Sequence, residues 1–192
     1  MKHTLTCIIA FFCTVNSAYS AGFGFEFGKP VSDYNCEAME GSTGVYECTP
    51  PGEHPYFESY VVRASSKHGV CWVKGIGKNI DDNGYGTNTV GRLKGFADAM
   101  TPVYGEPRKV DLILPNALWD DADEYLMSIR QNERTLAYVW EGEELGGKTK
   151  LNQIYVFAKA LSRDTGWVGI EYYSEDHEAC KSTSNAVDNS VL

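Results

Sequence analysis

Three runs in the last third of the chain decide the fold: RTLAYVW at residues 134–140, LNQIYVFAKAL at 151–161 and WVGIEYY at 167–173. Each run is rich in β-branched and aromatic residues, which is typical of strands. The connections at 141–150 and 162–166 are short, whereas parallel neighbours would need long crossovers. The three runs therefore predict an antiparallel meander.

A second pair of strands precedes this meander. Residues 57–63 read FESYVVR and residues 69–76 read GVCWVKGI, with a short polar turn between them, so they predict a hairpin. Further upstream, Phe23, Phe25 and Phe27 alternate with small or polar residues, which favours a short edge strand. Together these runs predict a largely antiparallel sheet of about five or six strands.

Two helices are expected between the hairpin and the meander. The first can be capped by Asn88 or Thr89. Its apolar residues follow at steps of three and four, and Gly105 then favours a stop. The second is predicted to start at Asn116, with an apolar stripe formed by Trp119, Ala122, Leu126 and Ile129. Because each helix has one apolar face, we expect both to pack on one face of the sheet in an α+β fold.

The first twenty residues have the pattern of a secretory signal peptide. Lys2 is followed by an apolar run from Leu5 to Val15 and by the small-x-small motif Ala18-Tyr19-Ser20, which predicts cleavage after Ser20. The apolar run is too short to span a bilayer, and no integral membrane segment is expected in the mature chain. The sequence therefore predicts an exported protein, either periplasmic or secreted.

Length and charge narrow the class of protein further. Residues 21–180 are enough for a single α+β domain, and the small, polar residues at 181–192 predict a disordered tail. The formal net charge is −9. Negative charge repels nucleic acid and attracts basic surfaces, so a basic protein is the expected partner. Acidity also keeps an exported protein soluble, and the sequence does not separate these two explanations.

Cysteines predict that the domain is braced by disulfides. Four of them follow the predicted signal peptide, namely Cys36, Cys48, Cys71 and Cys180. In an oxidising compartment an even number favours two disulfides, for which three pairings exist. We favour Cys36–Cys48, which closes a small loop, and Cys71–Cys180, which ties the hairpin to the C-terminal end. A zinc site is the alternative, but the chain has no Cys-x2-Cys pair.

Several short motifs fall short of a functional pattern. Residues 81–86 (DDNGYG) are similar to the start of a calcium loop. Counted from Asp81, however, the twelfth position is Arg92, where a calcium loop needs an acidic side chain. Residues 75–78 (GIGK) lack the spacing of a phosphate loop. Asp176, His177 and Glu178 are neighbours, and adjacent residues on a strand point to opposite faces. No catalytic, cofactor-binding or metal-binding residue is therefore assigned, and no cofactor is expected.

Aromatic residues gather in the Pro- and Gly-rich region before the hairpin. We predict that Tyr34, Tyr46, Tyr56 and Phe57 form an exposed surface for a protein partner. Packing in the core is the alternative for each of these rings.

Two stretches resemble an uncharacterised family of small exported proteins from Gram-negative bacteria. One is WDDADEYLMSIRQNERTLAYVW at 119–140, and the other is EYY at 171–173 followed by Cys180. The segment YGEP at 104–107, after a predicted helix, is also similar. The resemblance extends over about residues 57–181 and implies a compact exported α+β domain, without an activity, a cofactor or a catalytic residue to transfer.

These observations favour a non-enzymatic protein-binding module. An inhibitor or immunity protein that neutralises a toxin is its more specific form. The alternative is a cell-envelope hydrolase that uses Asp, Glu or His side chains. An enzyme should bring His54, His177 or a buried carboxylate together in a cleft, with shifted pKa values.

Overall fold

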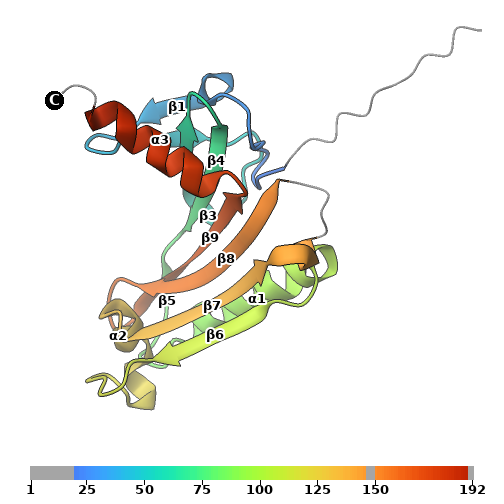
Figure 1. The fold of residues 1–192 in the computed structure, drawn as a ribbon. Coiled ribbons are helices and arrows are strands. Elements are labelled where there is room, and N and C mark those ends of the chain that lie inside the picture. Colours follow the sequence, from blue (N-terminus) through green and yellow to red (C-terminus); the bar gives the residue numbers. More distant parts are fainter. Residues whose placement is uncertain (1–19, 146–149, 190–192) are drawn as a thin grey trace, which may run out of the picture.

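One antiparallel sheet organises the chain in the computed structural model, which describes residues 20–145 and 150–189 (Figure 1). Eight strands pair in the order β1-β2-β3-β4-β9-β8-β7-β6, and the ninth, β5, pairs with β9. Their bounds are β1 (Asn35–Ala38), β2 (Val45–Thr49), β3 (Phe57–Ser65), β4 (Gly69–Gly77), β5 (Ile80–Asp81), β6 (Arg108–Ile113), β7 (Arg134–Glu141), β8 (Leu151–Ala160) and β9 (Thr165–Ser174). The predicted signal peptide lies almost entirely outside the described residues.

Helices lie on both faces of this sheet. The α-helices are α1 (Thr87–Tyr104), α2 (Tyr125–Arg130) and α3 (His177–Asn189), and short 3-10 turns cover Val31–Asp33, Ala122–Glu124 and Gly142–Leu145. Helix α1 packs on β8 and β9, whereas α3 packs on β3 and β4 from the opposite face (Figure 1). The predicted α+β class with a largely antiparallel sheet is confirmed. The predicted counts are wrong, because the described residues contain nine strands and three α-helices.

The N-terminal segment packs against the sheet without forming the predicted edge strand. Gly22, Phe23 and Gly24 have φ values of 79°, 53° and 77°, which turn the chain tightly. This turn places the Phe23 ring against Phe57 and Tyr60, with ring centroids 5.0 and 4.8 Å apart. The alternating phenylalanines therefore fill the core from a turn.

The predicted second helix is much shorter in the structure. Asn116 adopts a left-handed φ of 62°, and the carboxylate of Glu133 accepts hydrogen bonds from the backbone N–H groups of Leu118 (2.8 Å) and Trp119 (2.9 Å). These bonds hold the chain in an irregular conformation, so α2 begins only at Tyr125. The apolar stripe still reaches the core, where Leu126 and Ile129 are buried.

Helix α1 begins close to the predicted cap but is capped from outside. Its N-cap residue is Gly86, with a φ of 69° and no capping side chain. Instead, the carboxylate of Asp82 accepts hydrogen bonds from the backbone N–H groups of Asn88 (3.0 Å) and Thr89 (2.6 Å). The motif at 81–86 is thus the entry to α1, and one of its two aspartates stabilises the first turn.

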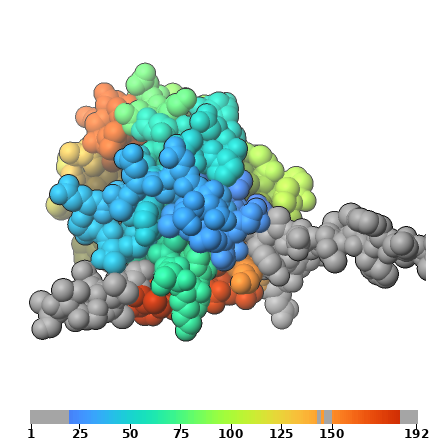
Figure 2. Space-filling view, turned by 90° about the horizontal axis from the view of Figure 1, so that it is seen from above, coloured from blue at the N-terminus to red at the C-terminus, as the bar shows by residue number. Residues whose placement is uncertain are grey.

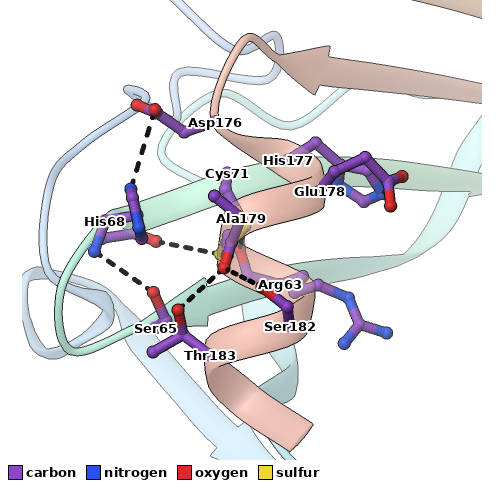
Figure 3. Close-up of a disulfide and its surroundings, with 12 residues drawn as sticks. Arg63, Ser65, His68, Cys71, Asp176, His177, Glu178, Ala179, Ser182 and Thr183 are labelled. Carbon is purple, nitrogen blue, oxygen red and sulfur yellow. Dashed lines mark hydrogen bonds and ion pairs between the residues drawn. A yellow bond between two sulfur atoms is a disulfide. The ribbon is translucent and has the colours of Figure 1, made fainter. Parts of the chain in front are cut away.

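A helix stands where the sequence predicts a disordered tail. Helix α3 continues past Cys180 to Asn189. Its buried Cys180 forms a disulfide with Cys71 of β4, so the helix is fixed across that strand (Figure 3). This attachment supplies the tertiary contact that a short polar helix lacks on its own. Residues 190–192 lie outside the described range.

Candidate functional site

A cleft of about 670 Å³ opens where the β1–β2 edge of the sheet meets the loop that precedes β3. We call it the acidic cleft. It is lined mainly by polar and acidic side chains from these three strands and from residues 50–55. Residues from about 20 to 60, coloured blue to cyan, form much of the face that Figure 2 shows.

Backbone hydrogen bonds hold the loop that forms one wall of the cleft. The prolines of the segment 50–55 exclude regular structure there. The Gly52 N–H donates to the Phe23 carbonyl (2.9 Å), and the Lys78 N–H donates to the Tyr56 carbonyl (2.9 Å). The loop is thereby fixed to the N-terminal segment on one side and to the end of β4 on the other.

The opposite wall is braced by a disulfide. Cys36 on β1 and Cys48 on β2 lie directly opposite each other in the sheet and are covalently linked. Together with Cys71–Cys180, this confirms the pairing that the sequence favours. The register that puts the cysteines opposite each other also places Glu37 opposite Glu47.

Negative charge in the acidic cleft exceeds positive charge, with four carboxylates against one ammonium group in the lining. Its acidic lining consists of Glu37, Glu47, Glu53 and Glu58, all exposed. Within the described part of the chain, none of the four forms an ion pair, and the Glu47 carboxylate only accepts a hydrogen bond from the Ser59 hydroxyl (2.9 Å). The lining includes one lysine, Lys78, whose ammonium group donates to the Pro55 carbonyl (2.7 Å). Like charges directly opposite on neighbouring strands destabilise a sheet, so Glu37 and Glu47 favour an added cation.

His54 adds no positive charge to this cleft. Its ring packs in an aromatic cluster with Tyr56, Phe57 and Phe96, with centroid distances of 5.5, 5.4 and 5.8 Å. This burial lowers the pKa of the His54 imidazole below its ordinary value, so the ring is neutral at neutral pH. The wall of the cleft is therefore apolar at this point, and its negative charge comes from the four exposed glutamates.

The four aromatic residues of the predicted partner surface do not form one exposed patch. Phe57 is buried in the core, and Tyr34 packs on Phe25 with a centroid distance of 5.0 Å. Tyr46 is partly buried against the core, and Tyr56 is 49% exposed. Phe57 lines the acidic cleft and Tyr56 stands beside it, so two of the four residues adjoin the candidate site.

A second group of ionisable side chains lies on the sheet face that α3 partly covers. Glu171 of β9 is only 9% exposed. Its carboxylate pairs with the Lys74 ammonium (3.1 Å) and accepts a hydrogen bond from the Tyr173 hydroxyl. Burial and this bond raise the pKa of Tyr173 far above its ordinary value. Both carboxylate oxygens of Glu171 are thus engaged, which suits a structural role.

The histidine at the start of α3 lies next to this group. The His177 ring packs edge-on against Tyr173 (centroids 4.9 Å apart), and burial lowers the pKa of its imidazole. Figure 3 shows that Asp176 points instead towards His68, to which it is 3.7 Å away. Among residues 20–145 and 150–189, no group of three or more His, Cys, Asp or Glu side chains is arranged to hold a metal ion.

Sequence reasoning missed the glutamates of the acidic cleft, although a signal for two of them exists. Glu37 follows Cys36 and Glu47 precedes Cys48, so a hairpin that joins the two cysteines must also set the two glutamates opposite each other. Glu53 and Glu58 reach the cleft through the fold of the loop, which no local pattern specifies.

No protein-family model matches the chain, and no curated protein or solved structure matches it either. None of the helices in the described part of the chain is both long and apolar enough to cross a bilayer.

Proposed function

We propose that this protein is an exported, non-enzymatic module that binds a basic protein through the acidic cleft. The observation that carries the proposal is the set of four exposed glutamates, Glu37, Glu47, Glu53 and Glu58, which line one cleft and form no ion pair with any described residue. Lysine or arginine side chains of a partner would supply the missing positive charge.

Electrostatics gives this surface two properties that suit recognition. A cleft lined by one sign of charge speeds the encounter with an oppositely charged partner. The repulsion between Glu37 and Glu47 is present in the free protein and is relieved when a cation sits between them. Part of the binding energy thus comes from strain that the unbound sheet already contains.

The rigidity of the walls supports the same role. The Cys36–Cys48 disulfide fixes β1 to β2, and the loop at 50–55 is held at both ends. A preorganised surface loses less conformational entropy on binding. Disulfides are also compatible with an oxidising, extracytoplasmic location, where an inhibitor or immunity protein would meet a toxin.

A hydrolase is the alternative, and the group around Glu171 is its best support. His177, Tyr173 and a buried carboxylate do converge there. General acid–base catalysis needs a carboxyl group that is free to exchange a proton with a substrate. Because Lys74 and Tyr173 occupy both oxygens of Glu171, this group favours the binding module over the enzyme.

The test is affinity purification of the mature protein from an extract of its own host. A double variant, Glu37→Gln with Glu53→Gln, removes two charges from the cleft. The matched control, Asp120→Asn with Asp121→Asn, removes two exposed charges outside the cleft lining. We expect the wild type and the control to retain the same basic protein, and the cleft variant to lose it.

Salt provides a second readout for the same experiment. Retention through charge should weaken as ionic strength rises, since salt screens exposed charges. Recovery of no partner, or of a partner that the cleft variant retains as well as the wild type does, would overturn the proposal.

A further inference from the structure

A second, smaller pocket lies on the other side of the aromatic cluster and has the opposite electrical character. Its volume is about 310 Å³, which falls in the range of small-molecule sites. It is formed by residues 55–56, the segment 77–80 that follows β4, Val168 and the half-buried side chains of Arg92 and Phe96 on α1. Its lining holds two cations, Lys78 and Arg92, and no aspartate or glutamate. This is notable in a chain whose formal net charge is −9.

The two cations are fixed on neighbouring residues. The Arg92 guanidinium lies over the Tyr56 ring, 3.8 Å from its centroid. The Lys78 ammonium donates to the carbonyl of Pro55, the residue before Tyr56 (2.7 Å). Within the described residues, Arg92 forms no ion pair. Both positive groups therefore line this pocket, and neither forms an ion pair with a described carboxylate.

The way in which each cation is held leaves donors for a ligand. A guanidinium that stacks on a ring uses its flat face, so its N–H groups still point outwards in the plane and match a carboxylate in bidentate fashion. The Lys78 ammonium uses one donor on Pro55, and its other donors remain. This arrangement fits a single carboxylate between Arg92 and Lys78.

The rest of the pocket is apolar. Phe96 packs against Tyr56 with ring centroids 6.0 Å apart, and Ile80 and the buried Val168 add aliphatic surface. Flat apolar groups gain from contact with such rings and aliphatic side chains. A ligand should thus have a planar apolar body as well as a negative charge.

We propose that this pocket binds a small aromatic carboxylate, with Arg92 and Lys78 holding the carboxylate and Phe96, Ile80 and Val168 contacting the ring. The linings of this pocket and of the acidic cleft share Pro55 and Lys78, but the occupants differ, because the cations of Arg92 and Lys78 would repel a basic protein. A free small molecule is the occupant, because a pocket of about 310 Å³ is too small for a folded surface.

Three probes separate the contributions of charge and ring. Phenylacetate has both, phenylacetamide has the ring without the charge, and acetate has the charge without the ring. We expect phenylacetate to shift the backbone amide NMR signals of Gly77, Lys78 and Arg92 in a saturable way. Phenylacetamide should bind at least about tenfold more weakly, since it lacks the charge-assisted hydrogen bonds of a carboxylate. Acetate should also bind at least about tenfold more weakly, since it has no ring to bury against the apolar wall.

Substitutions locate the site. Arg92→Gln should weaken phenylacetate binding about tenfold or more, and Lys78→Gln should weaken it in the same direction. Arg130→Gln, at an exposed arginine of α2 outside the pocket lining, is the matched control and should leave binding unchanged. Thermal unfolding of each variant checks that it is folded.

Two outcomes would overturn the proposal. One is that phenylacetamide binds as well as phenylacetate, because the cations would then contribute nothing. The other is that phenylacetate causes no saturable shift at these residues in the folded wild-type protein. A peptide that ends in phenylalanine is a further arm, and binding of that peptide in preference to phenylacetate would assign the pocket to a chain terminus instead.

Discussion

Glutamates at two places in one cross-strand row of the sheet differ in burial and in ion pairing. The row runs from Glu37 through Glu47 and Val61 to Lys74 and Glu171, each directly opposite the next. At its centre, Glu171 is buried and neutralised by Lys74. At the β1–β2 edge, Glu37 and Glu47 are exposed and face each other without a cation among the described residues.

This difference separates charge that serves the fold from charge that is available to a partner. A buried carboxylate without a counter-ion would cost several kcal/mol, so Lys74 is required for stability. An exposed pair of like charges costs little, because water screens it. The edge of the sheet can therefore carry uncompensated charge that its centre could not tolerate.

The largest effect is expected when the buried pair is broken. Lys74→Met leaves Glu171 buried without its cation, and we expect the free energy of unfolding to fall by about 3 kcal/mol or more. Urea unfolding at neutral pH measures this change. Lys94→Met is the control, because Lys94 and its partner Asp98 are 63% and 62% exposed. It should cost less than about 1 kcal/mol, and an equally small loss for Lys74→Met would contradict the comparison.

An intermediate effect is expected at Asp82, a carboxylate that caps a helix. Burial raises the pKa of Asp82, but hydrogen bonds from Thr89, Asn88 and Asn83 outweigh it and leave the pKa below its ordinary value of 3.8. Asp82→Asn should lower the free energy of unfolding by about 1–2 kcal/mol at neutral pH. Chemical denaturation measures it, with the exposed neighbour Asp81→Asn as the control.

The same carboxylate makes a testable contribution to acid stability. Because its folded pKa is depressed, the stabilisation by Asp82 is fully present above pH 3.8 and is lost as the pH falls through the lower folded value. The difference between wild type and Asp82→Asn should therefore shrink in strongly acidic solution. A difference that grows as the pH falls would show that the sign is wrong.

The smallest effect is expected at the edge. Glu37→Gln removes the repulsion with Glu47, so the free energy of unfolding should rise by about 0.2–1 kcal/mol at low salt. Glu58→Gln is the matched control, because Glu58 has no carboxylate opposite it in the sheet, and it should leave stability unchanged. Destabilisation by Glu37→Gln would mean that this carboxylate has a folding role after all.

Sequence patterns were most informative where one strand or helix carries its own signal. The strands from Phe57 to Gly77 and from Arg134 onwards are rich in β-branched and aromatic residues and were predicted. Strands β1, β2, β5 and β6 were missed because they are short or mostly exposed and lack an alternating pattern. Their conformation depends on pairing with β3, β9 and β7, which local sequence does not encode.

The candidate site was less predictable than the fold for a related reason. The cysteines allowed three disulfide pairings, and the favoured one, which is confirmed, implies the position of Glu37 opposite Glu47. The second pocket depends on Arg92 of α1 meeting Tyr56 of the loop before β3, two residues that are far apart in the chain. Such a contact arises from tertiary packing alone.

The Cys71–Cys180 bond affects what happens when a protease cleaves the chain. Its half-cystines are 109 positions apart, and the ring that they close includes α1, α2 and every strand from β5 to β9. A protease that nicks an exposed turn inside this ring cannot release either fragment while the two sulfurs stay joined. The rate at which a cleaved molecule separates into fragments thus depends on the rate of disulfide reduction as well as on the rate of backbone hydrolysis.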